Sequence, residues 1–318
     1  MPRLAVAILA AMLPAAAAAQ DLPPGKPIRV IVATGVGGTA DVFMRVLGEE
    51  YHRRYSRPFV VENRVGGGMN IGGRACAESP ADGSTICNLP NTTLTYNRYL
   101  YKKLPYDPDS FVPITNPFFN TQLLVVSAAL GVRTLDEVAA LSKAKPGTLS
   151  YTVPSEPLSV FMDWWRDKSG ADLVRVPFKG GGDSVNAMLN GAIPVAFFGI
   201  GNWLPHLAVG TVIPLAVDGE TRSTLLPEVP TLREHGYTGA VTRTYFGIVA
   251  PPATPQPIVK RIYEQIAAIG ADPEFRRKRI VEVGLEPVFD TPDEFARYLT
   301  EDRARAAIVA KAAGLVPQ

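Results

Sequence analysis

Four loops of small residues stand between apolar runs and segments of helical periodicity. The first, residues 34–38, follows the β-branched run 28–33; two others, 66–68 and 180–182, are triple glycines, and the fourth is the turn 154–157. The first amides of a helix lack intrahelical partners and lie at the positive end of its dipole, so they attract anions. Glycine lets the backbone approach such a ligand closely. A single loop of this kind is more often only a tight turn, but four of them together predict a site for a small anion such as a carboxylate.

The first loop also matches a dinucleotide-binding fingerprint. Residues 35–40 read G-x-G-x-x-A after an apolar run, and Glu62 ends the next apolar run about 20 residues on. Two features oppose this interpretation. The second run leads directly into another glycine loop, and the N-terminus predicts export to a compartment where nicotinamide cofactors are not expected. We therefore expect no cofactor.

Other enzyme chemistry has little support. The three histidines, His52, His206 and His235, are far apart, and the sequence has no H-E-x-x-H, C-x-x-C or G-x-S-x-G motif. Because triads are recognised by geometry, the missing motifs weaken the case for an enzyme without removing it. We expect a binding protein that is not an enzyme and holds no metal.

The N-terminus has the three parts of a secretory signal. Arg3 precedes an apolar core at residues 4–13, Pro14 ends that core, and an alanine run leads to Ala19. The core is shorter than the roughly 20 apolar residues that span a membrane. We expect residues 1–19 to be a signal peptide that is cleaved after Ala19. Since no cysteine stands near that position, the mature protein is expected in the periplasm, soluble and not a lipoprotein.

Apolar runs and helical segments alternate along the chain, which is typical of βαβ units. Such units form parallel sheets with right-handed crossovers and place the loops together at the carboxyl ends of the strands. The length of 318 residues suggests two domains, with no low-complexity linker between them. Strands are predicted at residues 28–33, 59–62, 84–87, 123–126, 149–153, 173–178, 193–198, 212–217 and 246–250, and helices at 257–270 and 293–313.

Charge is nearly balanced along the sequence. There are 32 Lys and Arg against 30 Asp and Glu, which gives a net charge of +2. This balance does not favour nucleic acid or an anionic membrane surface. A small molecule is the expected partner.

Cys76 and Cys87 are the only cysteines. In an exported chain such a pair can form one disulfide. Alternatively, both are small buried apolar residues, one on a helix and one on the following strand. The sequence leaves both interpretations open.

A series of short segments runs in order through the chain. They read KPIRVIV at 26–32, GGTAD at 37–41, VVENRVGGGMNIG at 60–72, PADG at 80–83, YKKLPYDP at 101–108, PFKG at 177–180, LPH at 204–206, LPEVPT at 226–231 and FGIVAP at 246–251. Together they resemble the Bug family of tripartite tricarboxylate transporter solute-binding proteins.

The resemblance implies a periplasmic-binding-protein fold of the type II-like class. Two α/β domains with mixed, mainly parallel sheets would close about a hinge on a ligand in the cleft between them. Domain 1 would comprise residues 26–122 plus 243–318, and domain 2 residues 123–242. The protein would be a monomer that delivers its ligand to the membrane components of a tripartite tricarboxylate transporter; an alternative role is that of a ligand sensor for a membrane receptor.

The resemblance also implies that backbone amides and ordered water hold a small carboxylate at the loops. Asp41 would hold the first loop or order water, Lys179 would be the main positive side chain near the anion, and Tyr245 would wall the cleft. The residues carried over by position are Gly37, Gly38, Thr39, Asp41, Gly66, Gly68, Asn70, Asn91 and Thr92 in domain 1, Ser155, Lys179 and Gly180 in domain 2, and Tyr245.

Three further candidates stand where the chain departs from the family pattern. Thr34 follows Ala33 where relatives carry Pro-Phe, which makes the pocket roomier. Glu156 would repel a second carboxylate but accept from an amine or hydroxyl. Phe198 and the glycine after it replace an Asp-Asn pair, which argues against an α-amino acid and offers apolar or stacking contact. We therefore expect a monocarboxylate with an apolar or aromatic body.

Overall fold

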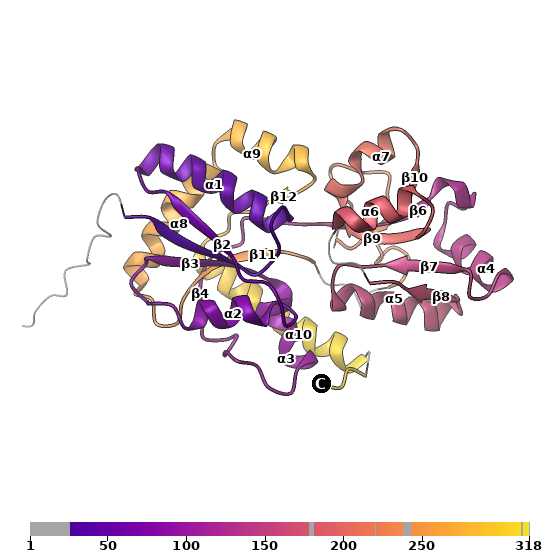
Figure 1. Ribbon diagram of the computed structural model, residues 1–318, viewed down its shortest axis with the longest axis horizontal. Coiled ribbons are helices and arrows are strands. Elements are labelled where there is room, and N and C mark those ends of the chain that lie inside the picture. The colour runs from indigo at the N-terminus through magenta and orange to yellow at the C-terminus, as the bar shows by residue number, and fades with distance from the viewer. Residues whose placement is uncertain (1–25, 178–180, 220, 238–242, 313, 318) are drawn as a thin grey trace, which may run out of the picture.

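The computed structural model describes residues 26–177, 181–219, 221–237, 243–312 and 314–317. The predicted signal peptide lies outside this range. The described chain forms two α/β domains, each built on a five-stranded sheet (Figure 1). Within the described ranges, no helix combines the length and the apolar character needed to cross a membrane.

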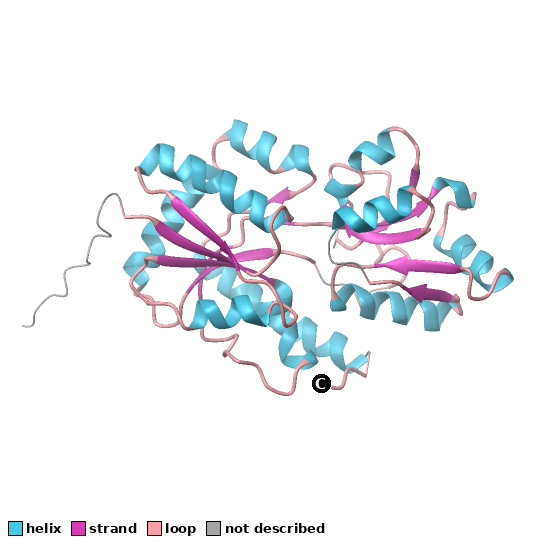
Figure 2. Ribbon diagram, viewed as in Figure 1, coloured by secondary structure: helices cyan, strands magenta, loops and turns pink. Residues whose placement is uncertain are grey.

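The first sheet has the strand order β2-β1-β3-β11-β4, and only β11 runs against its neighbours. Side chains alternate along each strand. Val30 of β1 therefore packs with α1 and α8, whereas Ile31 packs with α2 and α10. Helices thus cover both faces of the sheet (Figure 2). The strands are β1 (Ile28–Val32), β2 (Phe59–Asn63), β3 (Thr85–Pro90), β4 (Val112–Thr115) and β11 (Phe246–Ala250), and the helices are α1 (Thr39–Tyr55), α2 (Asn70–Ala77), α8 (Gln256–Gly270), α9 (Pro273–Arg279) and α10 (Pro292–Ala312).

The second sheet has the order β10-β6-β9-β7-β8, and here only β6 runs against the others. Leu124 of β6 joins a core with α4 and α5, and Leu123 joins a core with Met188 of α6 on the other face. The strands are β6 (Gln122–Ser127), β7 (Leu149–Thr152), β8 (Leu173–Arg175), β9 (Val195–Gly199) and β10 (Val212–Val217), and the helices are α4 (Leu135–Ala144), α5 (Glu156–Ser169), α6 (Gly181–Leu189) and α7 (Leu204–Ala208).

Two crossing segments, residues 119–122 and 243–246, join the domains. They pair with each other: the N–H of Asn120 donates to the carbonyl of Thr244 at 2.8 Å, and Phe119 and Tyr245 form an antiparallel bridge. At the start of the first segment, β5 (Phe118–Phe119) pairs with β12 (Glu286–Pro287). The predicted domain boundaries fall near these segments and remain a prediction.

The sheets confirm the predicted mixed, mainly parallel α/β fold, since four of the five strands in each sheet share one direction. Several elements were not predicted, among them α4, α9 and the following two. A π-helical turn, η1 (Thr92–Tyr96), runs into the short helix α3 (Asn97–Leu100) after β3. The edge strand β4 contains a proline, and that residue hid the strand because proline normally marks a loop.

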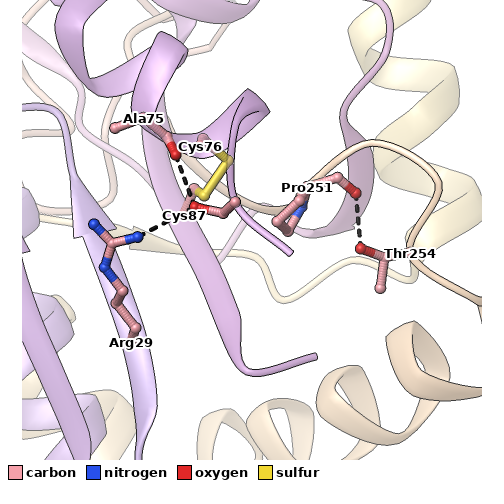
Figure 3. The surroundings of a disulfide bond; sticks show 7 residues. Arg29, Ala75, Cys76, Cys87, Pro251 and Thr254 are labelled. Atoms are coloured by element: carbon pink, nitrogen blue, oxygen red, sulfur yellow. Dashed lines mark hydrogen bonds between the residues drawn. A yellow bond between two sulfur atoms is a disulfide. The ribbon is translucent and has the colours of Figure 1, made fainter. Parts of the chain in front are cut away.

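Cys76 and Cys87 form a disulfide in the structure. Figure 3 shows the bridge beside Ala75, with the side chain of Arg29 directed toward the end of α2. Both cysteines are fully buried. The bridge ties the end of α2 to β3, and these two elements carry the second glycine loop and Asn91.

Candidate ligand site

Asp41 holds the first loop from the first turn of α1. Its Oδ2 accepts the N–H of Gly37 at 2.8 Å, and its Oδ1 accepts Nε of Arg45 at 3.0 Å. Only 2% of Asp41 is exposed. Burial alone would raise the pKa of this carboxyl, but the hydrogen bonds from Arg45 and Gly37 outweigh burial, so the pKa is lowered. The charged side chain is therefore an internal brace of the loop.

Asn63 also holds the first loop, although the sequence did not predict a role for it. Its Nδ2 donates to the carbonyl of Thr34 at 2.9 Å, and its Oδ1 accepts Nη2 of Arg45 at 3.2 Å. The only sequence signal for it was an amide side chain directly after a strand. Because β1 and β2 are parallel neighbours, Asn63 at the end of β2 reaches the loop that follows β1.

The predicted donors Gly37 and Gly38 are both used inside the loop. The N–H of Gly37 meets Asp41, and the N–H of Gly38 donates to the carbonyl of Gly35 at 3.2 Å. Helix geometry instead offers the first amides of α1, which begins at Thr39. The expected anion position thus moves from the loop to the start of the helix.

Two threonine hydroxyls lie at corresponding places in the two sheets. Thr34 follows the end of β1, and Thr152 is the last residue of β7. The Oγ1 atoms of both are buried and make no hydrogen bond within the described part of the chain. A buried hydroxyl is costly unless water or a ligand meets it. Thr152 was not among the predicted site residues, because only its position at the end of a parallel strand distinguishes it from other threonines.

The second loop has an unusual backbone that only glycine adopts easily. Gly66, Gly67 and Gly68 have φ angles of 117°, 55° and 61°, and Met69 follows at 71°. At Gly68 a β-carbon would lie 2.0 Å from the hydroxyl of Tyr101. All three glycines are exposed, so the loop presents its backbone to solvent.

Asn70, at the start of α2, holds this second loop in place. Its Oδ1 accepts Nδ2 of Asn97 at 2.6 Å and the hydroxyl of Tyr106 at 2.8 Å. Nδ2 of Asn97 also donates to the carbonyl of Gly68 at 2.9 Å. Asn97 and Tyr106 were missed because they come from distant parts of the sequence.

Asn91 faces the second crossing segment. Its N–H donates to the carbonyl of Tyr245 at 3.1 Å, and its Nδ2 donates to the carbonyl of Arg243 at 3.3 Å. Thr92 is buried and begins η1. In the structure these residues therefore connect β3 to the crossing segment.

Tyr245 and Phe198 require a correction, since both were expected to present a ring to the ligand. Tyr245 has no exposed surface, packs edge-on against Phe119 and Phe295, and donates its hydroxyl to Asp302 at 3.0 Å. Phe198 is 4% exposed and belongs to a core with Trp203. The ring of Tyr245 packs against α10, and the ring of Phe198 shares its core with Met188 of α6, so neither lines a site in this structure.

The second domain contributes the start of α5. Ser155 is the N-cap of α5, is half-buried, and makes no side-chain capping hydrogen bond. Glu156 is the first residue of the helix, but its side chain lies outside the described set, as do Lys179 and Gly180 entirely. Figure 1 shows the starts of α5 and α6 on the side of their sheet that faces the first domain.

Glu62 does not fit the dinucleotide interpretation. Its two carboxylate oxygens accept Nε and Nη2 of Arg29, both at 2.9 Å, and Arg64 donates to the same group at 2.8 Å. The hydrogen bond from Arg29, followed by that from Arg64, lowers the pKa of Glu62 to about 2. A carboxylate held by two guanidinium groups is not placed to bind a ribose.

A cavity of about 380 Å³ lies beside the crossing segments. None of the predicted ligand residues lines it, and its three carboxylates suit a carboxylate ligand poorly. Among the described residues, no three His, Cys, Asp or Glu side chains gather as a metal site would require. The cavity is lined by Phe119, Arg243, Val288, Asp290, Glu294, Arg297, Tyr298 and Glu301.

Comparison with known proteins decides the family. The sequence model of the tripartite tricarboxylate transporter family receptor matches residues 43–315. The chain belongs to this receptor family. The receptor is 30% identical to the protein BugT of Bordetella pertussis, over 94% of this chain and 93% of that protein. The predicted Bug-family resemblance is therefore confirmed.

Solved structures agree with this assignment. An R. palustris protein solved with adipate superposes with a TM-score of 0.82 at 28% identity, covering 93% of the receptor and 99% of that chain. MatC from Rhodopseudomonas palustris with bound malate gives 0.78 at 25% identity, covering 90% and 99%. The receptor is a periplasmic solute-binding protein for a tripartite transporter and not an enzyme.

Proposed function

We propose that the receptor captures a small carboxylate between its domains and delivers it to the membrane components of the transporter. The observation that carries this proposal is the pair of buried hydroxyls of Thr34 and Thr152, which make no hydrogen bond among the residues that the structure describes. Each lies at the end of a strand in a different sheet, just before a helix start, at α1 and at α5. Hydroxyls and first-turn amides together form a set of donors suited to an anion.

The acidic groups near the first loop do not strongly repel the negative charge of a ligand. Asp41 and Glu62 are both paired with arginines. Two relatives of similar fold were solved with adipate and with malate, which are small aliphatic carboxylates. Through this likeness we extend the ligand class, though not the ligand, to the receptor.

Among carboxylates, we propose that the receptor prefers a monocarboxylate with an apolar body. This preference depends on Glu156, whose charge at the first position of α5 disfavours a second carboxylate nearby. Phe198 does not support this preference, because its ring lies in the core.

Calorimetric titration of the protein without residues 1–19 tests both levels of the proposal. Hexanoate and adipate are a matched pair, since they have the same carbon chain and differ in the second carboxylate. We expect hexanoate to bind at least about tenfold more tightly than adipate, and Glu156→Gln to narrow that gap, with about 1.4 kcal/mol per factor of ten. Tighter binding of adipate with no effect of Glu156→Gln would contradict the monocarboxylate preference. No binding of hexanoate, adipate or malate would contradict the carboxylate proposal.

A further inference from the structure

Asp302 is a buried carboxyl group outside the proposed ligand site. It lies in α10 with no exposed surface, and its Oδ2 accepts the hydroxyls of Thr95 at 2.9 Å and Tyr245 at 3.0 Å. Arg305, one turn further along α10, approaches Oδ1 only to 3.6 Å. Burying a carboxyl is costly unless hydrogen bonds compensate. These contacts join three elements that are far apart in the sequence.

The hydroxyl of Thr95 has one hydrogen but two acceptors within reach. The carbonyl of Asn91 lies at 2.8 Å and Oδ2 of Asp302 at 2.9 Å. A neutral Asp302 removes this competition, because its own O–H then donates to Thr95, which donates to the carbonyl of Asn91. Burial raises the pKa of Asp302, against the opposing hydrogen bonds from Thr95 and Tyr245, and so favours this neutral form. The result is a continuous set of hydrogen bonds from α10 to the end of β3.

Tyr245 extends this network into the second crossing segment. Its ring packs edge-on against Phe119 and Tyr298, and its carbonyl accepts the N–H of Asn91. Asp302 thus fixes both η1, through Thr95, and residues 243–246, through Tyr245.

Two of the elements that Asp302 joins, α10 and η1, also pack against α5 of the other domain. Val160 of α5 lies in a small buried apolar cluster with Tyr96 of η1 and with Ala306 and Val309 of α10. This cluster is a contact between the two domains. Because α5 begins at the proposed ligand site, this contact sets the distance between the first turn of α5 and the loops of the first domain.

We propose that Asp302 is a positioning residue for ligand binding. Through Thr95 and Tyr245 it holds η1 and the second crossing segment, so that α5 is seated with its first turn in place. This inference rests on the proposed function, and it concerns how the site is held, not which groups touch the ligand.

The test compares variants of the whole protein by amide hydrogen exchange without ligand and by calorimetric affinity for hexanoate and adipate. Asp302→Asn keeps a hydrogen-bonding group at the Oδ2 position, whereas Asp302→Leu removes it. Leu299→Ala is the matched control, because it removes a buried side chain of α10 that shares a core with Tyr245 but makes no hydrogen bond in the network. For Asp302→Leu we expect exchange of amides 91–96 to rise at least about tenfold and affinity to fall at least about tenfold, whereas Asp302→Asn stays within about twofold of the wild type.

Leu299→Ala is expected to lower the melting temperature with affinity within about twofold of the wild type. Unchanged exchange at 91–96 in Asp302→Leu would overturn the proposal, as would raised exchange with unchanged affinity or an equal affinity loss in Leu299→Ala. If Asp302→Leu does not fold, Thr95→Val takes its place. This nearly isosteric variant removes the hydroxyl that bonds Asp302, and we expect the same rise in exchange and the same loss of affinity. If the wild type binds none of hexanoate, adipate and malate, the proposed function fails, whereas the ligand-free exchange still decides whether Asp302 holds η1.

Discussion

The loops and the crossing segments use carboxyl groups in opposite ways. At the loops, Asp41 and Glu62 are hydrogen-bonded to arginines, and their pKa values are lowered, in Asp41 despite burial. Beside the crossing segments, Asp218 and Asp302 are fully buried, and burial raises their pKa values.

This difference separates two structural tasks. The charged carboxylates brace the loops, and the arginines offset their charge, so a ligand anion meets backbone donors without strong repulsion. The buried carboxyls hold the segments that connect the domains, and burial favours the form that places no charge where those segments pack. Removing a carboxyl should therefore affect stability with opposite pH dependence in the two regions.

Asp218 is expected to give the largest effect. Its Oδ1 accepts the N–H of Gln122 at 2.8 Å, and burial raises its pKa to about 8 although that bond and Arg243 oppose the shift. The unfolded chain releases the same proton at about pH 4. The folded state therefore binds more protons between these values, and the stabilisation, complete below about pH 4, is lost as pH rises toward 8. We expect the free energy of unfolding to fall by up to about 1.4 kcal/mol per pH unit in this window.

Urea unfolding from pH 5 to pH 8 measures this slope. Asp218→Asn keeps a neutral side chain of the same shape, so the variant is expected to flatten the dependence on pH. If Asp218→Asn keeps the wild-type slope, Asp218 does not cause the pH dependence of stability. The proposed contrast between the carboxyls at the loops and those beside the crossing segments would then fail.

Gly68→Ala tests the second glycine loop, with Gly67→Ala as a matched control at the neighbouring position. Gly67 and Gly68 both have positive φ, but a β-carbon at Gly67 meets nothing closer than 3.8 Å, whereas one at Gly68 meets Tyr101. We expect Gly67→Ala to lower the free energy of unfolding by about 1 kcal/mol and Gly68→Ala by about 2 kcal/mol or more, with weaker carboxylate binding only in the latter. Equal effects in the denaturation curves would show that contact with Tyr101 does not shape the loop.

Asp41→Asn is expected to have the smallest effect on stability. The variant loses a charged acceptor for Gly37 and Arg45, which we expect to cost about 1 kcal/mol at pH 7. Since the pKa of Asp41 is lowered, its contribution is present above about pH 4 and is lost as pH falls further, opposite in sign to Asp218. Unfolding curves at pH 7 and pH 3 measure this, with the exposed Glu228→Gln as control. A larger loss at pH 3 than at pH 7 would contradict the assignment.

Local patterns predicted much of this structure. The glycine loops and the apolar runs are local signals, and the link between Asp41 and Gly37 spans only four residues. The braces through Asn63, Asn97 and Asp302 could not be predicted, because each depends on which strands or helices become neighbours. Phe198 and Tyr245 were misplaced for another reason: where a strand is apolar on both faces, its sequence does not show which side chains face the core.

The position of the bound carboxylate distinguishes the proposed site at the loops from the cavity beside the crossing segments. We would determine a crystal structure with whichever of hexanoate, adipate or malate binds in the titration. We predict carboxylate oxygens about 2.7–3.1 Å from the first amides of α1 and from the hydroxyl of Thr34 or Thr152. A carboxylate found instead beside Arg243 and Arg297, in the cavity next to the crossing segments, would contradict this prediction.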